Sequence, residues 1–343
     1  MEILPTLWFV LIAVLWTGYL FLEGFDLGVG MHMLVSARGE TDRRVMLNTI
    51  GPVWDGNEVW LITAAGATFA AFPYWYASLF SAMYIPLVFV LLGLIFRAVA
   101  IEYRGKGTST RWIRGWTLVL GLGSFISAFG VGAMLALTTT GLPLDQNGDR
   151  VGGAFAWFTW YAVLGGLAVV GFCLVHAATF LALKTDGTLR TRARVFATRW
   201  APIALLPLTG WVIAVQLAND KPLLVLVVAL AVAAAVWGWF ANRRGSEGRA
   251  FIGFGAFLVA GSAAIFANVF PVVLPSTLNP AWNLTVTNAS ATAYTLGVMT
   301  VVACIGLPLV LAYQAWTYWV FRRRIRGSQL PQPVEVVAAV KHS

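Results

Sequence analysis

Four acidic residues stand in otherwise apolar stretches, where carboxyl groups could move protons. They form two pairs, Glu23 with Asp26 and Asp55 with Glu58, and the members of each pair are three positions apart. In a helix this spacing puts both members on one face. A carboxylate in hydrocarbon is costly, so each must face a protein interior, pair with a cation or hold a proton. Two interpretations stay open: a proton or cation path, or structural contacts that tie helix ends together.

The other metal-binding and redox residue types are sparse. Histidine occurs only as His32, His176 and His342, and the two cysteines, Cys173 and Cys304, lie in apolar runs. Buried haem is usually held by His, Met or Cys side chains at defined positions. No Cys-x-x-Cys-His attachment site is present, and the methionines follow no pattern. We therefore expect this chain to ligate no metal, His176 to be a packing residue, and any redox cofactor to belong to another chain.

The amino-acid composition indicates whether the segments that carry these residues lie in water or in lipid. Of 343 residues, 59% are apolar and only 11% are charged, against roughly 25% charged in an ordinary soluble domain. So much apolar surface excludes a water-soluble globule and a disordered chain. The net charge of +9 does not indicate nucleic-acid binding, because the basic residues are scattered between apolar runs instead of forming one patch. The sequence predicts an all-α integral membrane protein.

Apolar stretches of about 20 residues are long enough to cross a membrane as helices. The sequence has nine of them, at residues 7–34, 54–72, 75–96, 115–137, 155–183, 200–218, 222–241, 250–270 and 292–321. We expect residues 1–326 to form a single polytopic membrane domain and residues 327–343 to form a flexible cytoplasmic tail.

The basic residues predict the orientation of these helices. Lys and Arg accumulate in cytoplasmic loops, and all 23 basic residues except Arg150 and Lys221 fall in alternate loops or the C-terminal tail. This count assigns Arg97 to the loop after the third stretch. It predicts nine transmembrane helices with the N-terminus outside and the C-terminus in the cytoplasm. Both acidic pairs then lie in the cytoplasmic half, and Gly24 and Gly28 form a small-xxx-small pair that lets another helix approach.

Several sequence blocks, in order along nearly the whole chain, resemble subunit II of the cytochrome bd quinol oxidases. The most specific are EGFDLGVG and GPVWDGNEVWLITA, because chance similarity between membrane proteins would not reproduce their polar positions. The matching blocks are residues 23–30, 51–64, 69–73, 96–97, 103–104, 110–112, 190–193, 270–276, 295–299 and 313–319.

The resemblance implies a bacterial cell-membrane complex that oxidises quinol and reduces oxygen to water in respiration. In that family, subunit I holds two b-type haems and one d-type haem and oxidises the quinol. Subunit II has two four-helix bundles plus one additional helix and stabilises subunit I as a heterodimer. The resemblance also allows membrane lipid and small accessory subunits as partners. Nucleic acid is not an expected partner.

The resemblance also assigns roles at matching positions. Asp26 and Asp55 correspond to acidic residues associated with a proton channel from the cytoplasm, and Glu23 fills a position that is commonly acidic. Glu58 stands where the resemblance also allows Gln. Trp54 and Asn57 lie inside the motif and are expected to orient the path through hydrogen bonds.

Two other functions remain as alternatives. A proton-coupled secondary transporter would also need intramembrane carboxylates, but such proteins usually have internal repeats and interrupted helices near the midplane, neither of which the sequence shows clearly. A purely structural subunit fits the missing ligands equally well and differs only at the four carboxylates.

Overall fold

The computed structural model describes residues 3–219 and 221–325, most of which are helical. Its α-helices are α1 (Ile3–Val35), α2 (Glu40–Ile50), α3 (Trp54–Ala71), α4 (Pro73–Ala82), α5 (Tyr84–Tyr103), α6 (Thr110–Thr140), α7 (Trp160–Lys184), α8 (Gly187–Ala204), α9 (Leu206–Asn219), α10 (Val225–Arg243), α11 (Glu247–Val269) and α12 (Ala293–Val320). The remaining elements are the 3-10 turns η1 (Arg104–Lys106), η2 (Pro222–Leu224) and η3 (Pro280–Trp282), and the short strands β1 (Val272–Leu274) and β2 (Leu284–Thr285), which pair antiparallel.

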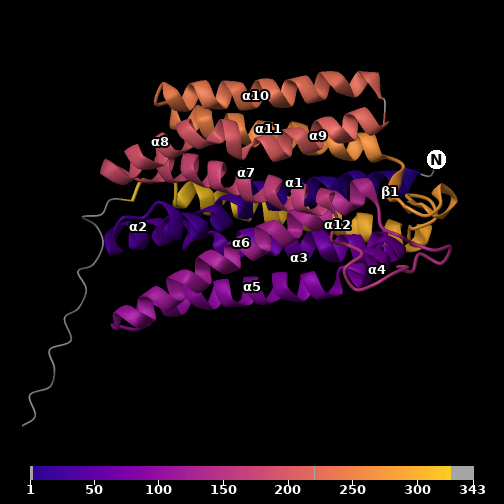
Figure 1. Cartoon of the computed structure of the whole chain (residues 1–343), viewed down its shortest axis with the longest axis horizontal. Helices are drawn as coiled ribbons and strands as arrows, with labels where there is room; N and C mark the ends of the chain where they lie inside the picture. Colours follow the sequence, from indigo (N-terminus) through magenta and orange to yellow (C-terminus); the bar gives the residue numbers. More distant parts are fainter. Residues whose placement is uncertain (1–2, 220, 326–343) are drawn as a thin grey trace, which may run out of the picture.

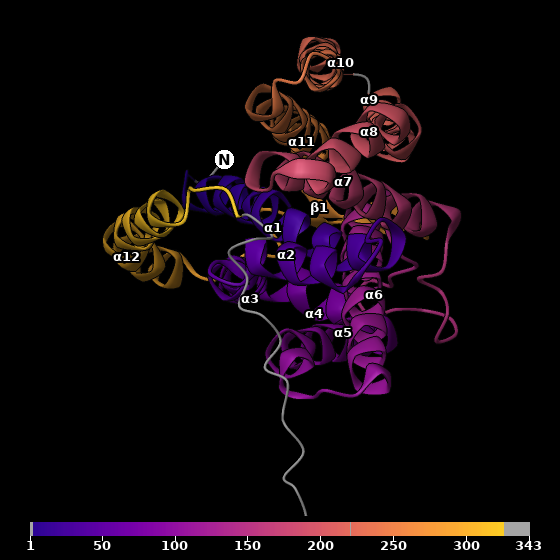
Figure 2. The ribbon, with the colours of Figure 1, turned by 90° about the vertical axis from the view of Figure 1, so that its left-hand side faces the viewer.

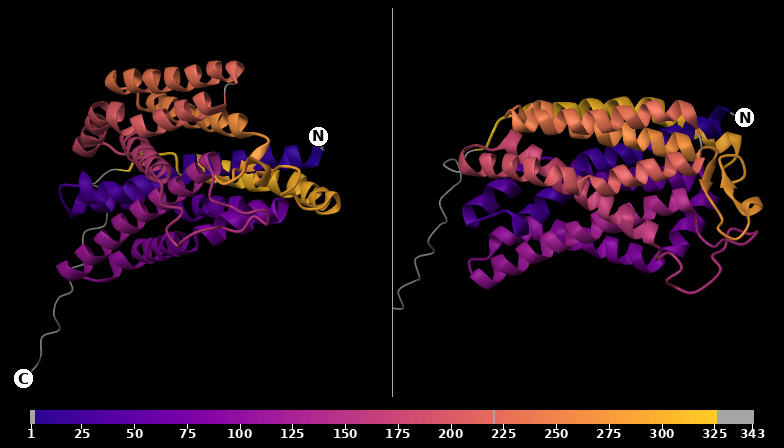
Figure 3. Two further views of the ribbon diagram at one scale, coloured as in Figure 1. Left: turned by 45° about the vertical axis from the view of Figure 1, so that its right-hand side comes forward. Right: turned by 45° about the horizontal axis from the view of Figure 1, so that its top comes forward.

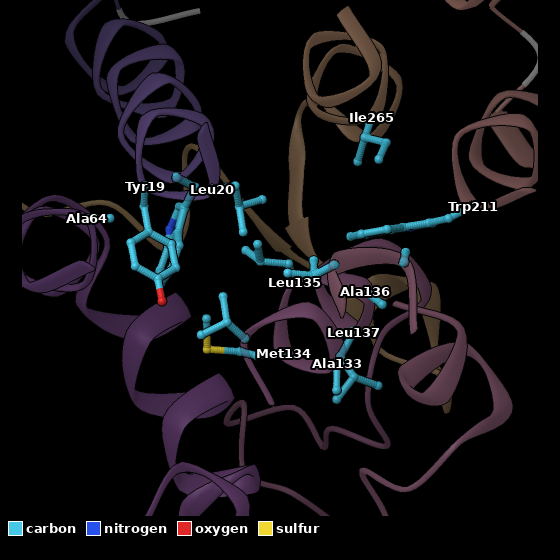
Figure 4. Packing of buried hydrophobic residues seen from close by; sticks show 14 of the residues in the cluster. Tyr19, Leu20, Ala64, Ala133, Met134, Leu135, Ala136, Leu137, Trp211 and Ile265 are labelled. Carbon is cyan, nitrogen blue, oxygen red and sulfur yellow. The ribbon is translucent and has the colours of Figure 1, made fainter. Parts of the chain in front are cut away.

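The long helices lie side by side along the long axis of the molecule (Figure 1). Viewed from the end, α1 and α7 lie in the middle, with α8 to α11 on one side, α3 to α6 on the other, and α12 standing out beside α1 and α3 (Figure 2). The interior between them is apolar: Leu20 of α1, Leu135 of α6, Trp211 of α9 and Ile265 of α11 belong to one buried cluster (Figure 4).

The two ends of this bundle differ in character. The N-terminal end of α1, the long 141–159 loop and the β1–β2 segment gather at one end (Figure 3). At the other end are α2, η1, the start of α8 and the end of α12. Most basic residues lie in the segments at this second end, as their alternation along the sequence predicts.

Among the described residues, eight helical segments are long and apolar enough to cross a membrane. The all-helical membrane class is therefore confirmed. The second predicted stretch, 54–72, corresponds to α3, which falls outside the eight because Asp55, Asn57 and Glu58 fill its first two turns. The predicted tail at 327–343 lies outside the described residues.

The predicted third stretch, 75–96, is wrong in its bounds. The chain forms two helices there: α4 ends at Ala82 and α5 runs from Tyr84 to Tyr103. A proline inside a helix lacks the N–H needed for the backbone bond to the preceding turn but fits the first turn. Pro86 accordingly lies in the first turn of α5, which displaces the long helix toward the basic end of the bundle.

The glycine pair on α1 allows α7 to approach at one of its two positions. A Cβ at Gly28 would lie 2.0 Å from the carbonyl oxygen of Cys173 and 2.4 Å from the Cβ of Ala177. At Gly24 the nearest atom, in the Phe172 ring, would be 3.4 Å away. Gly28 is therefore the position that requires glycine.

We expect Gly28→Ala to force α1 and α7 apart and to destabilise the protein by about 1 to 3 kcal/mol, as overpacking of a filled interior does. Gly24→Ala is the matched control, because its added methyl group makes ordinary contacts. Thermal unfolding of the two purified variants checks this, and equal melting temperatures would contradict the α1–α7 contact.

Candidate functional site

The site is built on one face of α1, where Glu23 and Asp26 point into the protein. Both side chains are fully buried, and α1 runs without interruption past them. Two carboxyl groups one helical turn apart in a buried place repel each other when both are ionised. The predicted sharing of a helix face thus brings both groups into the buried interior.

The cation paired with Glu23 is Arg97, which the pattern of basic residues predicts to lie in a loop. That placement is wrong: Arg97 lies in α5, and its side chain is fully buried. Its Nη1 is 2.7 Å from Oε1 of Glu23 and 3.3 Å from Oε2 of Glu58. A buried carboxylate is tolerated when a cation compensates its charge, and Arg97 supplies that charge within the bundle.

A close contact between α5 and α6 positions Arg97. A Cβ at Gly123 of α6 would lie 2.5 Å from the carbonyl oxygen of Gly93 and 3.3 Å from the Cβ of Arg97. The backbones of α5 and α6 are therefore in close contact at Gly93 and Gly123. The guanidinium group extends from this contact to α1 and α3, where its carboxylate partners lie.

Asn57 connects the acidic face of α1 to α12. Its Nδ2 donates to Oδ2 of Asp26 at 2.7 Å, and its Oδ1 accepts hydrogen bonds from the Tyr318 hydroxyl at 2.7 Å and from Nε2 of Gln314 at 3.2 Å. Gln314 in turn accepts from Nε1 of Trp60 at 2.8 Å. Asn57 is fully buried, so this bridge fixes the orientation of the Asp26 carboxyl group.

The second acidic pair is divided between the interior and the surface. Glu58 contacts Arg97 and retains 17% side-chain exposure, whereas Asp55 is exposed on the first turn of α3. The structure therefore joins Glu23 and Glu58 through Arg97, holds Asp26 beside them through Asn57, and leaves Asp55 outside. Trp54 is half-buried as the first residue of α3.

Sequence reasoning missed three members of this network: Arg97, Gln314 and Tyr318. One signal was present for Arg97, because it directly follows an apolar run and could continue its helix. Gln314 offered another, as one of few amides within an apolar stretch. Tyr318 resembles the interfacial aromatic residues common in membrane proteins, so no local pattern distinguishes it from them.

The histidines at this depth are held in packing contacts. Nε2 of His176 lies 3.1 Å from the carbonyl oxygen of Phe21, and its ring stacks on Phe172 and Phe251. Nε2 of His32 lies 2.9 Å from the carbonyl oxygen of Leu174. Within residues 3–219 and 221–325, no group of three or more His, Cys, Asp or Glu residues could hold a metal ion.

The chemistry available to this cluster is proton exchange. Glu23 and Glu58 contact one guanidinium group, and Asp26 is buried one helical turn from Glu23, so full ionisation of all three would leave uncompensated negative charge in a buried place. Ionising Glu23 and Asp26 together would place two negative charges one turn apart in the interior, which favours a proton on one of them. A second proton-binding carboxyl group close by, at the partly exposed Glu58, gives the cluster the means to take up and hold protons.

Comparison with known proteins relates this arrangement to one family. A sequence profile described as "Cytochrome bd terminal oxidase subunit II" matches residues 4–321. The cytochrome bd ubiquinol oxidase subunit 2 of Bacillus subtilis is 40% identical over 95% of this chain and 98% of its own length. The cytochrome bd-I ubiquinol oxidase subunit 2 of Escherichia coli K12 is 32% identical over 94% of this chain and 96% of its own length.

The fold has a counterpart among solved structures. A chain of the bd oxidase from Geobacillus thermodenitrificans superimposes with a TM-score of 0.78, covering 93% of this chain and 99% of that one. Its sequence identity is 17%, so this likeness concerns the arrangement of helices.

Proposed function

The chain belongs to the cytochrome bd terminal oxidase subunit II family, and from this premise we propose that its buried carboxyl cluster takes up protons from the cytoplasm for oxygen reduction. The family indicated by the sequence motifs is thereby confirmed. The chain is a membrane-spanning component of a quinol-oxidising oxidoreductase complex.

The observation that carries the proposal is the graded exposure of the acidic residues. Asp55 is exposed, the Glu58 side chain is 17% exposed, and Glu23 and Asp26 are fully buried. Arg97 contacts both Glu58 and Glu23 and so joins the outer and inner groups. In the proposed route, protons enter near Asp55, reach Glu58, and pass beside Arg97 to Glu23 and Asp26.

The direction of uptake depends on an orientation that we also propose. The basic end of the bundle faces the cytoplasm, the N-terminus lies outside, and α3 crosses the membrane as a ninth helix. Asp55 lies in the first turn of α3, directly after α2 at the basic end. The entrance of the route is then on the cytoplasmic side. Proton uptake from that side moves charge across the membrane during respiration.

The proposed partner is a haem-bearing subunit I, to which this chain would add stability and the proton route. Two b-type haems and one d-type haem would belong to that partner, and these groups would supply the electron transfer and oxygen chemistry. On α12 the side chains are mostly exposed, while Gln314 and Tyr318 reach inward to Asn57. A partner packed against α12 would therefore be linked to Asp26 through Asn57.

Membership of the oxidase subunit family argues against the alternative of a proton-coupled secondary transporter. A purely structural subunit remains the competing interpretation, and it differs only in whether the carboxyl cluster exchanges protons. The buried network favours exchange, because structural contacts alone would be served by an ion pair without the second and third carboxyl groups.

The complex purified through a tag on this chain tests the proposal. We expect its reduced-minus-oxidised spectrum to show b- and d-type haems, and quinol to drive oxygen uptake by the same sample. In liposomes with the cytoplasmic face inward, turnover should make the interior alkaline. Oxygen uptake without interior alkalinisation would contradict proton uptake from the cytoplasm, and a colourless protein without a haem-bearing partner would contradict the whole assignment.

A further inference from the structure

A second feature at the basic end is a cavity of about 490 Å³ among α1, α7, α11 and the end of α12. It has an apolar wall, formed largely by Phe25, Phe180, Leu183 and Phe251. It shares Phe21, Leu22 and Tyr318 with a groove of about 840 Å³ that continues between α1, α11 and α12 toward the other end. The cavity thus opens at the basic end and leads into a long apolar channel.

The mouth of the cavity is positively charged. Lys184, Arg322 and Arg324 line it, and no carboxylate is among the residues that line it. The nearest acid in contact with them, Glu247, is 3.8 Å from Arg324 but only 2.7 Å from Arg190. Its charge is therefore largely compensated elsewhere, and the mouth keeps a surplus of positive charge.

Apart from the long contact between Arg324 and Glu247, the three cations contact neutral groups. Lys184 donates to the carbonyl oxygens of Phe321 and Arg323. Nη1 of Arg324 donates to those of Ala182 and Thr185 at 3.1 and 2.7 Å. These bonds attach the end of α12 to α7 but involve neutral acceptors. Arg322 lies just beyond the end of α12 and stacks on Trp319 of that helix, 4.4 Å from the ring centre.

We infer that this cavity binds one anionic phospholipid of the inner leaflet. Its phosphate lies at Arg322, Lys184 and Arg324, and an acyl chain runs along Phe25 and Phe251 into the longer groove. Basic pockets between transmembrane helices at the cytoplasmic surface are suited to anionic headgroups. A free phosphate would use the basic mouth but would leave the apolar wall uncovered, whereas a phospholipid matches both parts.

The test measures which lipid stays with the complex. The tag-purified complex is placed in nanodiscs of equal phosphatidylglycerol and phosphatidylcholine, re-extracted in mild detergent, and its retained lipid is quantified by mass spectrometry. We expect the native complex to retain phosphatidylglycerol preferentially. Arg322→Glu reverses one charge, and each cation near a membrane surface contributes enough attraction that this preference should fall by roughly thirtyfold. Arg322→Lys should restore it.

Arg243→Glu is the matched control. Arg243 ends α10 at the same end of the bundle and also stacks on a tryptophan, Trp239, at 4.8 Å, but it lies outside the cavity. An equal loss in Arg243→Glu would show that general surface charge is responsible and would overturn the site. Displacement of the lipid by inorganic phosphate or by short-chain dihexanoyl phosphatidylglycerol would show that the apolar wall is not used, and would also overturn it.

Discussion

Asp26→Asn is expected to slow quinol-driven oxygen consumption by about 100-fold, the lower part of the range for losing a positioned proton-transfer group. An amide has nearly the shape of a carboxyl group, and its oxygen can still accept the hydrogen bond that Asn57 donates at 2.7 Å. The bridge to α12 and the packing of α1 should therefore persist. What the variant loses is the capacity of this group to bind and release a proton.

The measurement is oxygen uptake per haem by the purified complex, with the haem content determined on the same sample. Asp149→Asn is the control, because Asp149 is an exposed carboxylate in the loop at the opposite end of the bundle. Full turnover by Asp26→Asn with normal haem would refute the proton route. Loss of the haems would instead assign Asp26 a structural role.

How far the sequence could predict this site depends on which interactions are local. The shared face of Glu23 and Asp26 follows from helical spacing alone, because residues three apart on one helix lie on the same side of it. The α3 pair has the same spacing, yet Asp55 is exposed and Glu58 contacts Arg97. Spacing fixes a shared face of a helix but does not fix how far that face is turned into the bundle.

The error at Arg97 has a physical cause of the same kind. Hydropathy treats a charged residue at the end of an apolar run as the start of a loop, since an unpaired charge does not stay in the membrane. The carboxylates that compensate Arg97 come from α1 and α3, 74 and 39 positions earlier in the chain. No local pattern contains that information. Pairing across the bundle overrides the local rule and extends α5 past Arg97 to Tyr103.

The helices themselves were more predictable than the site, because the apolar stretches are long enough to identify membrane-crossing segments. Their breaks were less so. Pro73 begins α4 and Pro86 lies in the first turn of α5, and both prolines are visible in the sequence. Whether a proline breaks a helix or only bends it depends on the packing around it, as Pro308 inside the continuous α12 shows.

Arg97→Met is expected to destabilise the chain by about 3 to 5 kcal/mol, the usual cost of leaving a buried charge without its partner. Glu23, fully buried and 2.7 Å from the guanidinium group, would keep no cation. We expect a greatly reduced yield of assembled complex and a lower melting temperature in what assembles. Arg97→Lys preserves the charge and should be milder, although an ammonium group cannot reproduce the planar fork of guanidinium.

A second arginine provides the comparison that isolates burial as the cause. Arg104 is paired with Glu40 at the same 2.7 Å, but the Glu40 side chain is 43% exposed. After Arg104→Met, water can solvate the remaining carboxylate, so we expect a loss of only about 1 kcal/mol. Adding Glu23→Gln to Arg97→Met should recover much of the lost stability, because the orphaned charge is then removed. Without such recovery, the stability supplied by Arg97 would have to come from its packing between α5 and α6, and the ion pair would not be what holds this site together.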